Sequence, residues 1–213
     1  MTVPVAIFGG PGSGAVVAQS VDALAARGEG IQVVGFLNDV LSLGEVVSGV
    51  PVIGPFASWG TLADDVQFIA PLHKAKVMQE RARIIEALGI PENRWISVVD
   101  PMSAVAPDVT IGPGCYIGPF VSVGPGARLG PHTVLRAGAH VGHDCRIGEF
   151  VFVGANAVIC GFSTMQDGAY VAPSATISDR RQVGKFAVVG LGAVVTKDVA
   201  DFQAVYGVPA RGP

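Results

Sequence analysis

The sequence predicts two architectures in one chain: a small Rossmann-like α/β domain over residues 1–99, followed by a parallel β-helix over residues 100–213. The first part alternates short apolar runs with helical patterns, which is typical of parallel α/β domains. The second part repeats every six residues, a period that is typical of a solenoid. The composition agrees with a turn-rich fold, because half of the 213 residues are hydrophobic, 29 are glycine and only 15% are charged.

The repeat runs without interruption from Val105 to Ala200, as sixteen consecutive hexapeptides. All sixteen first positions are aliphatic or Met, and nine second positions are Gly. Fifteen fifth positions are small or short residues, and Arg181 is the exception. A period of six fits neither an amphipathic helix nor an alternating strand. It predicts coils of three short strands, about eighteen residues around, with the first and fifth side chains inside.

Apolar runs and the polar residues that end them predict the elements of the α/β domain. Strands are expected at Val3–Phe8, Ile31–Leu37, Val50–Ile53, Val66–Ile69 and Trp95–Val99. One helix is expected after the first strand, because apolar residues recur at helical spacing from Val16 to Leu24. A second is expected over His73–Leu88, where Gly89 ends the pattern.

The loop Gly9–Gly14 lies between the first strand and the first helix, where backbone N–H groups and a helix N-terminus can hold a phosphate. Gly10, Gly12 and Ser13 are therefore candidate substrate-binding residues. The glycines follow the pattern G-x-G-x-G, which misses the dinucleotide fingerprint, and the domain is short for a dinucleotide fold. An NAD-dependent oxidoreductase is disfavoured. The loop is either a phosphate or nucleotide site or only a tight turn.

Stacking the repeat at eighteen residues predicts which side chains share a face of the solenoid. One outward column is apolar or aromatic throughout: Tyr116, Val134, Phe152, Tyr170, Val188 and Tyr206. Another reads as a solvated face: Thr110, Arg128, Arg146, Thr164, Gln182 and Ala200. A continuous exposed apolar column normally marks an interface. We expect a subunit contact in a closed homo-oligomer, with a monomer carrying a mobile cover as the alternative.

His143 is the candidate catalytic residue of the repeat. It occupies a third hexad position near a corner, and Gly161, one coil further, leaves space beside its ring. Asp144 follows directly and could orient the imidazole or stabilise its cation, an arrangement suited to a general base. From the residues alone, a structural role for His143 stays equally open. The other histidines are expected to be solvated or to decorate a helix: His73, His132 and His140.

Charge and cysteine content exclude several function classes. The net charge is −3 and no basic run is present, so nucleic acid and anionic membranes are not expected partners. The first residues lack the basic region of a signal peptide, and we expect a cytoplasmic protein. The cysteines fall inside the repeat as core filler, and no metal site is expected: Cys115, Cys145 and Cys160.

The hexapeptide array resembles that of the hexapeptide-repeat acyltransferases. Within that superfamily the chain resembles the bacterial sugar acetyltransferases of the NeuD/PglD type, which include sialic acid O-acetyltransferases. The segments that carry the resemblance are IFGGPGSGAVV, GFLND, GVPVIG, GHDCRIGEF and YGVPAR. The resemblance implies a left-handed β-helix and a general base at His143 with its acidic neighbour Asp144.

The resemblance also implies the ligands. It implies a homotrimer that binds acetyl-CoA between adjacent β-helices, which would use the apolar column defined above. The residues expected to contact CoA are Gly161, Gly190, Ala193 and Arg211. The residues expected to meet the base of a nucleotide-linked sugar are Asn38 and Asp39. The implied reaction is direct acetyl transfer to the amine of a nucleotide-linked amino sugar in surface-polysaccharide synthesis. O-acetylation of a sugar or sialic acid, and a non-catalytic β-helix scaffold, are the alternatives.

The chain departs from the family pattern at four places. Phe152 stands where many relatives have a second His, and Asp100-Pro101 replaces a His-Pro. In the α/β domain, Ser13-Gly14-Ala15 replaces part of a Gly-His-Gly-Lys loop, and Ala70-Pro71-Leu72 replaces a Gly-Asp-Asn segment. Most of the departures concern the part that recognises the sugar nucleotide.

Overall fold

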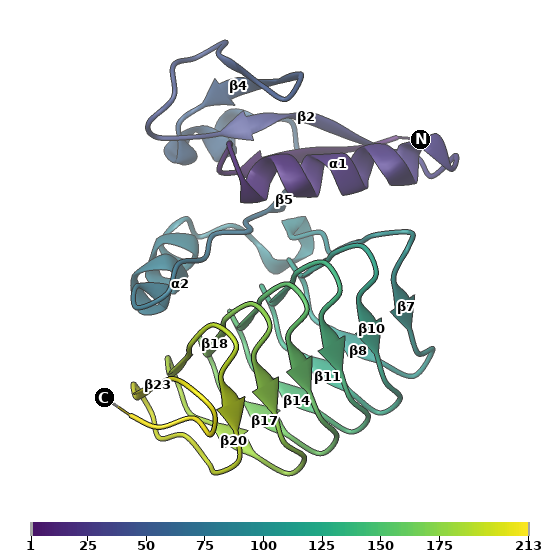
Figure 1. Ribbon diagram of the computed structural model, residues 1–213. Helices are drawn as coiled ribbons and strands as arrows, with labels where there is room; N and C mark the ends of the chain where they lie inside the picture. Colours follow the sequence, from purple (N-terminus) through teal and green to yellow (C-terminus); the bar gives the residue numbers. More distant parts are fainter. Residues whose placement is uncertain (1, 213) are drawn as a thin grey trace.

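The computed structural model describes residues 2–212 and places a small α/β unit along one side of a solenoid (Figure 1). The α/β sheet has the strand order β3-β4-β2-β1-β5. Its strands are β1 (Val3–Phe8), β2 (Ile31–Leu37), β3 (Val46–Val47), β4 (Val50–Gly54) and β5 (Gln67–Ile69). All neighbours are parallel except β3 and β4. The helices are α1 (Ser13–Ala26) and α2 (Met78–Ala87), with short 3₁₀ turns η1 (Phe56–Thr61) and η2 (Glu92–Arg94).

Two predicted elements of this unit differ from the structure. The second helix begins at Met78, not His73, because Lys76 has a φ of 67°, which is incompatible with a continuous α-helix; the His73 ring stacks on Phe152 of the solenoid. The predicted strand Trp95–Val99 is divided between the two units. Trp95 bridges to Phe68 of the α/β sheet, whereas Val98–Val99 (β6) pairs with a strand of the solenoid.

The solenoid consists of two-residue strands at six-residue intervals that stack into three parallel sheets. The first sheet joins β6 (Val98–Val99), β9 (Tyr116–Ile117), β12 (Val134–Leu135), β15 (Phe152–Val153), β18 (Tyr170–Val171), β21 (Val188–Val189) and β23 (Ala204–Val205). The second joins β7 (Ala104–Val105), β10 (Ser122–Val123), β13 (His140–Val141), β16 (Val158–Ile159), β19 (Thr176–Ile177) and β22 (Val194–Val195). The third joins β8 (Thr110–Ile111), β11 (Arg128–Leu129), β14 (Arg146–Ile147), β17 (Thr164–Met165) and β20 (Gln182–Val183). The predicted β-helix is confirmed.

The interior of the solenoid follows the repeat. First-position side chains such as Ile117, Leu135 and Ile159 are fully buried in one continuous core. Small fifth-position residues such as Ala127 and Ala157 are buried beside them. The corners carry non-glycine residues at positive φ, among them Asp144. The alternation of large and small inward residues is the packing that the hexapeptide pattern predicts.

The last coil is shorter than the repeat predicts. Ala204, not Tyr206, pairs with Val188, and Val199 bridges to Val183. Tyr206 and Ala200 therefore do not continue the columns in which the sequence places them. The chain turns back instead, so that Tyr206 pairs antiparallel with Arg211 and its ring lies over Gly190.

Most of the apolar column is buried in this chain, so the expectation of a continuous exposed apolar face is wrong. Tyr116 is 1% exposed and Phe152 is 4% exposed, because both pack into one cluster with Val17 and Val21 of α1. Figure 1 shows α1 between its own sheet and the solenoid. The α/β unit of the same chain therefore buries most of the surface that the repeat leaves apolar.

A buried polar network crosses the same interface. The Ser20 hydroxyl donates to the carboxylate of Asp100 at 2.6 Å, and the Ser20 oxygen lies 2.9 Å from the Tyr116 hydroxyl. Since Ser20 has one hydroxyl hydrogen, the Tyr116 O–H must donate to Ser20. Asp100 thus joins α1 to the solenoid. Among the helices of residues 2–212, none combines the length and apolar character required to cross a membrane.

Candidate active site

His143 and Asp144 form a hydrogen-bonded pair at the corner between β13 and β14. His143 Nδ1 lies 2.9 Å from an Asp144 carboxylate oxygen, and both side chains are about half exposed. Asp144 has a φ of 56°, and its N–H donates to the Pro125 carbonyl of the coil before. With Nδ1–H donating to the carboxylate, the lone pair of a neutral imidazole is at Nε2. The pair can accept a proton from a group that reaches Nε2.

Two residues of the next coil hold the imidazole in place. A Cβ added at Gly161 would lie 2.7 Å from His143 Nε2, so only glycine leaves the ring its position. The Phe162 ring meets the imidazole edge-on at 4.8 Å, and the Arg180 guanidinium covers Phe162 at 4.3 Å. Gly161 could be identified from the sequence, whereas Phe162 was not among the predicted site residues. The signal was its place directly after Asp144 in the same corner column.

Replacing Gly161 with Ala tests this packing. The added methyl group forces the imidazole away from its contact with Asp144, so we expect kcat for the proposed acetyl transfer to fall about tenfold or more. The fold should persist, because the displaced ring is half exposed and can move into solvent. Steady-state kinetics and a thermal melt check both statements. An unchanged kcat would show that the ring position above Gly161 is not the reactive one.

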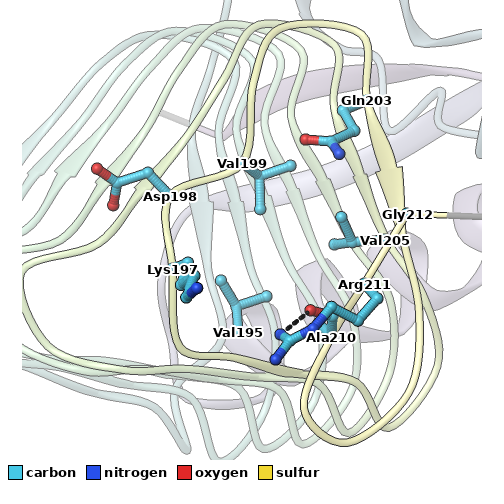
Figure 2. A pocket seen from close by; sticks show the side chains of 9 residues that line it. All are labelled: Val195, Lys197, Asp198, Val199, Gln203, Val205, Ala210, Arg211 and Gly212. Atoms are coloured by element: carbon cyan, nitrogen blue, oxygen red, sulfur yellow. Dashed lines mark hydrogen bonds between the residues drawn. The ribbon is translucent and has the colours of Figure 1, made fainter.

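The residues expected to contact CoA are spread along the solenoid. Ala193 is fully buried in the core, so its side chain cannot touch a ligand. Gly190 lies under the Tyr206 ring. Arg211 lies at the far end of the solenoid, beside Lys197 in a hollow of about 190 Å³ with a floor of core valines (Figure 2). There its guanidinium donates to the Ala210 carbonyl at 2.8 Å.

The predicted substrate residues of the α/β unit gather at the carboxyl ends of β1 and β2. Gly10 and Gly12 form the loop before α1, and Gly12 has a φ of 80°. The Asn38 amide donates to the Gly9 carbonyl at 2.9 Å, and its oxygen accepts from two N–H groups of its own loop. Asp39 accepts from the Phe56 N–H at 2.7 Å. The structure therefore brings the loop and Asn38 together, while Asp39 ties β2 to η1.

Ser13 lies next to a basic and aromatic cluster between the two units. Its hydroxyl is 3.4 Å from Nε2 of His73, whose ring stacks on Phe152 at 3.9 Å. Burial lowers the pKa of His73 to about 4, and the charge of Arg136 acts in the same direction. One terminal nitrogen of Arg136 is buried without a hydrogen-bond partner among residues 2–212. The prediction that His73 decorates a helix surface is wrong, because the solenoid covers its ring.

The ring of His132 is also largely covered, contrary to the expectation of a solvated side chain. Its ring stacks on Phe150 at 4.8 Å and meets the edge of Trp95 at 4.7 Å. Burial lowers its pKa to about 4. His140 is partly buried too, with its Nδ1 2.7 Å from the Ser122 hydroxyl.

The lowered pKa of His132 predicts acid sensitivity. Below pH 6.5 the imidazole of His132 is protonated in the unfolded chain, whereas in the folded chain it stays neutral until about pH 4. The free energy of unfolding therefore falls as the pH drops from 6.5 to 4. His132→Phe keeps the ring stack and removes the titration, since Phe150 shows that this corner accepts Phe at positive φ. Between pH 7 and pH 5, we expect the free energy of unfolding of the variant to fall by on the order of 1–2 kcal/mol less than that of wild type. Urea unfolding at both pH values measures the difference, and equal losses would refute the assignment.

Cys115 and Cys145 lie in the core as expected, whereas Cys160 is only partly buried and directly precedes Gly161 beside the His143 pair, so the expectation of core filler is wrong for Cys160. Cys115 and Cys145 are fully buried, and burial raises the pKa of the Cys115 thiol to about 11. The Cys145 thiol donates to the Cys160 carbonyl. Across residues 2–212, no group of three or more His, Cys, Asp or Glu side chains is placed to hold a metal ion.

Comparisons with known proteins agree with the repeat and the fold. The family model for the bacterial transferase hexapeptide (six repeats) matches residues 108–143 and 126–161. The acetyltransferase domain of PglB from Neisseria gonorrhoeae, in complex with acetyl coenzyme A, is 26% identical over all of both chains, with a TM-score of 0.85. PerB from Caulobacter crescentus, in complex with CoA and GDP-perosamine, is 25% identical over 99% of this chain and 97% of its own, with a TM-score of 0.83. WeeI from Acinetobacter baumannii is 27% identical over all of both chains, with a TM-score of 0.81. No curated protein matches the sequence significantly.

The repeat and the fold together give this chain a left-handed β-helix built from hexapeptides, and the matches indicate an acyltransferase. It has the architecture of the PglB acetyltransferase domain, of PerB and of WeeI, which it resembles along essentially its whole length.

Proposed function

We propose that the protein transfers the acetyl group of acetyl-CoA to the amine of a nucleotide-linked amino sugar. The observation that carries the proposal is the His143–Asp144 pair, with its 2.9 Å hydrogen bond and its free Nε2 over Gly161. The similarity to a structure holding acetyl coenzyme A and to another holding CoA with GDP-perosamine supports the choice of donor and acceptor. Surface-polysaccharide synthesis is the process that such a product would serve.

In the proposed reaction His143 acts as general base. Nε2 accepts a proton from the acceptor amine as the nitrogen attacks the thioester carbonyl, and CoA leaves as the thiolate or thiol. Asp144 holds the tautomer with hydrogen at Nδ1 and stabilises the imidazolium that forms. Phe162 and Gly161 hold the plane of the ring. No acyl-enzyme is required, which agrees with the burial of Cys145 next to the pair.

The remaining binding roles complete the proposal. Gly161, Gly190 and Arg211 would contact the donor, with Ala193 supporting that coil from inside the core. Residues at the ends of β1 and β2 would bind the nucleotide: Gly10, Gly12, Ser13, Asn38 and Asp39. The acceptor-binding unit would end near Trp95, which bridges to Phe68, and the acyltransferase unit would begin at β6, so the division falls a few residues before the expected 99–100.

A homotrimer is part of the proposal, but its contacts must differ from the apolar column. The α/β unit of the same chain covers most of the sheet that carries Tyr116 and Phe152. A trimer would therefore use the two remaining sheets, those of β13 and β14. Their shared corner carries His143, so an adjacent copy would complete the walls of the site.

The test measures the release of CoA thiol from acetyl-CoA by the purified protein in the presence of each acceptor of a panel. The panel contains UDP-, GDP- and dTDP-linked 4-amino sugars together with free sialic acid. We expect turnover with at least one nucleotide-linked amino sugar, and N-acetylation of its product by mass spectrometry. Turnover with sialic acid alone would replace the proposal by O-acetylation. No turnover with any acceptor of the panel, together with no binding of CoA, would favour a non-catalytic β-helix.

A further inference from the structure

The sheet that contains β11 and β14 carries two arginines in direct register. Arg128 and Arg146 are paired residues of adjacent parallel strands, and both side chains are exposed on the outward face. Adjacent strands lie about 4.8 Å apart, so the two positive side chains leave the sheet side by side. Like charges that face each other across a ladder destabilise a sheet, which makes this pair unfavourable without a partner.

Neither guanidinium has an acidic or hydrogen-bonding partner within residues 2–212, whereas neighbouring cations on the same side of the solenoid do. Lys185 lies 3.0 Å from the Asp167 carboxylate, and Arg181 lies 3.7 Å from Asp198. Positive charge at Arg128 and Arg146 is therefore left uncompensated in a region where other basic residues are paired. An anion from outside the chain would remove the repulsion.

The two arginines border the candidate active site. A hollow of about 430 Å³ is lined by Arg128, Arg146, Thr164, Phe162 and Asp144. Asp144 and Phe162 are the residues that touch the His143 imidazole. A second hollow of about 420 Å³ extends the surface along the same arginines to Lys185. A ligand held by the arginines would therefore lie next to the reacting base.

We propose that Arg128 and Arg146 bind a phosphate group of one of the two substrates beside the His143–Asp144 pair. The arginine fork matches phosphate oxygens two at a time, and two adjacent forks suit a dianion or a diphosphate. The Thr164 hydroxyl adds a neutral donor on the next strand. The inference rests on the proposed function, since both acetyl-CoA and a nucleotide-linked sugar carry phosphates.

The test measures binding without turnover. Isothermal titration is done on the intact wild type, on the double variant Arg128→Gln/Arg146→Gln, and on Arg83→Gln as a control on the exposed face of α2. The probes are CoA, 3′-dephospho-CoA, GDP and UDP. We expect Kd for CoA or for the nucleoside diphosphates to rise about a hundredfold in the double variant, about tenfold for each of the two guanidinium groups, and not to change in the control.

Which of the four probes bind more weakly to the double variant identifies the substrate that carries the phosphate. A rise confined to GDP or UDP assigns the site to the acceptor, and a rise confined to the CoA compounds assigns it to the donor. Unchanged Kd values for all four probes overturn the proposal. If the double variant in addition shows a lower particle mass than wild type in light scattering, the arginines form a contact between copies instead. Failure of wild type to bind any probe also overturns it. A lack of turnover with the acceptor panel of the proposed function does not overturn it, because the titration measures binding of the four probes without turnover.

Discussion

Replacing His143 with Asn should lower acetyl transfer by about 10²–10⁴-fold, the range that a general base contributes. Asn keeps a polar side chain of similar size but cannot accept the proton at the position of Nε2. The thermal midpoint should stay that of wild type, because the imidazole is about half exposed and lies outside the core. The measurement is kcat with the acceptor found in the panel, together with a melt of the same preparation.

His140→Asn is the matched control, since His140 lies three residues earlier and pairs with Ser122 instead of with an acid. Its activity should remain close to that of wild type. Asp144→Asn should lose less than His143→Asn, because the base remains and only its orientation weakens. Full activity of His143→Asn would contradict the mechanism. An equal loss in His140→Asn would point to a general disturbance of the solenoid.

Phe152→Ala should destabilise the chain by about 3–5 kcal/mol, as truncation of a buried aromatic ring does. Phe152 is 4% exposed and lies between the rings of His73 and Tyr170, at 3.9 and 4.6 Å. Its loss opens a cavity between the α/β unit and the solenoid. Chemical unfolding measures the change, and light scattering should show the same particle mass as wild type.

Phe120→Ala is the control for this prediction, because Phe120 also sits in the repeat but is 64% exposed. It should change the free energy of unfolding by less than about 0.5 kcal/mol. If Phe152→Ala instead separated an oligomer into stable single chains, the apolar column would be a subunit contact after all.

The strands and core of the solenoid could be predicted because they depend on local periodicity. Every residue at a first position, such as Ile159, meets the same kind of neighbour one coil before and one coil after. The predicted register therefore holds from Thr110 to Gln182, strand by strand. It fails at Tyr206, where a shorter corner moves the last strand and no further coil constrains it.

The pairing of His143 with Asp144 and the space over Gly161 were also predictable, since adjacency and an eighteen-residue step are both contained in the sequence. Phe162 follows from the same step but was missed, because an aromatic residue at an exposed corner has no recognisable catalytic signature. Arg128 and Arg146 were placed in a solvated column. Their lack of partners could be seen only once the ion pairs of Lys185 and Arg181 were known.

By itself the sequence determined the architecture, the facing of each repeat position and the acid–base pair at the corner. Only the tertiary structure decided what covers the outside of the solenoid. The apolar column indicated an interface. A residue such as Phe152, however, can be buried equally well by another copy or by α1 of its own chain. Burial of His73 depends on Phe152, 79 residues further along the chain, and burial of His132 depends in part on Trp95, 37 residues before it; the six-residue period does not predict either contact. Hydrophobic burial is non-directional, so the pattern requires a partner surface without specifying which one.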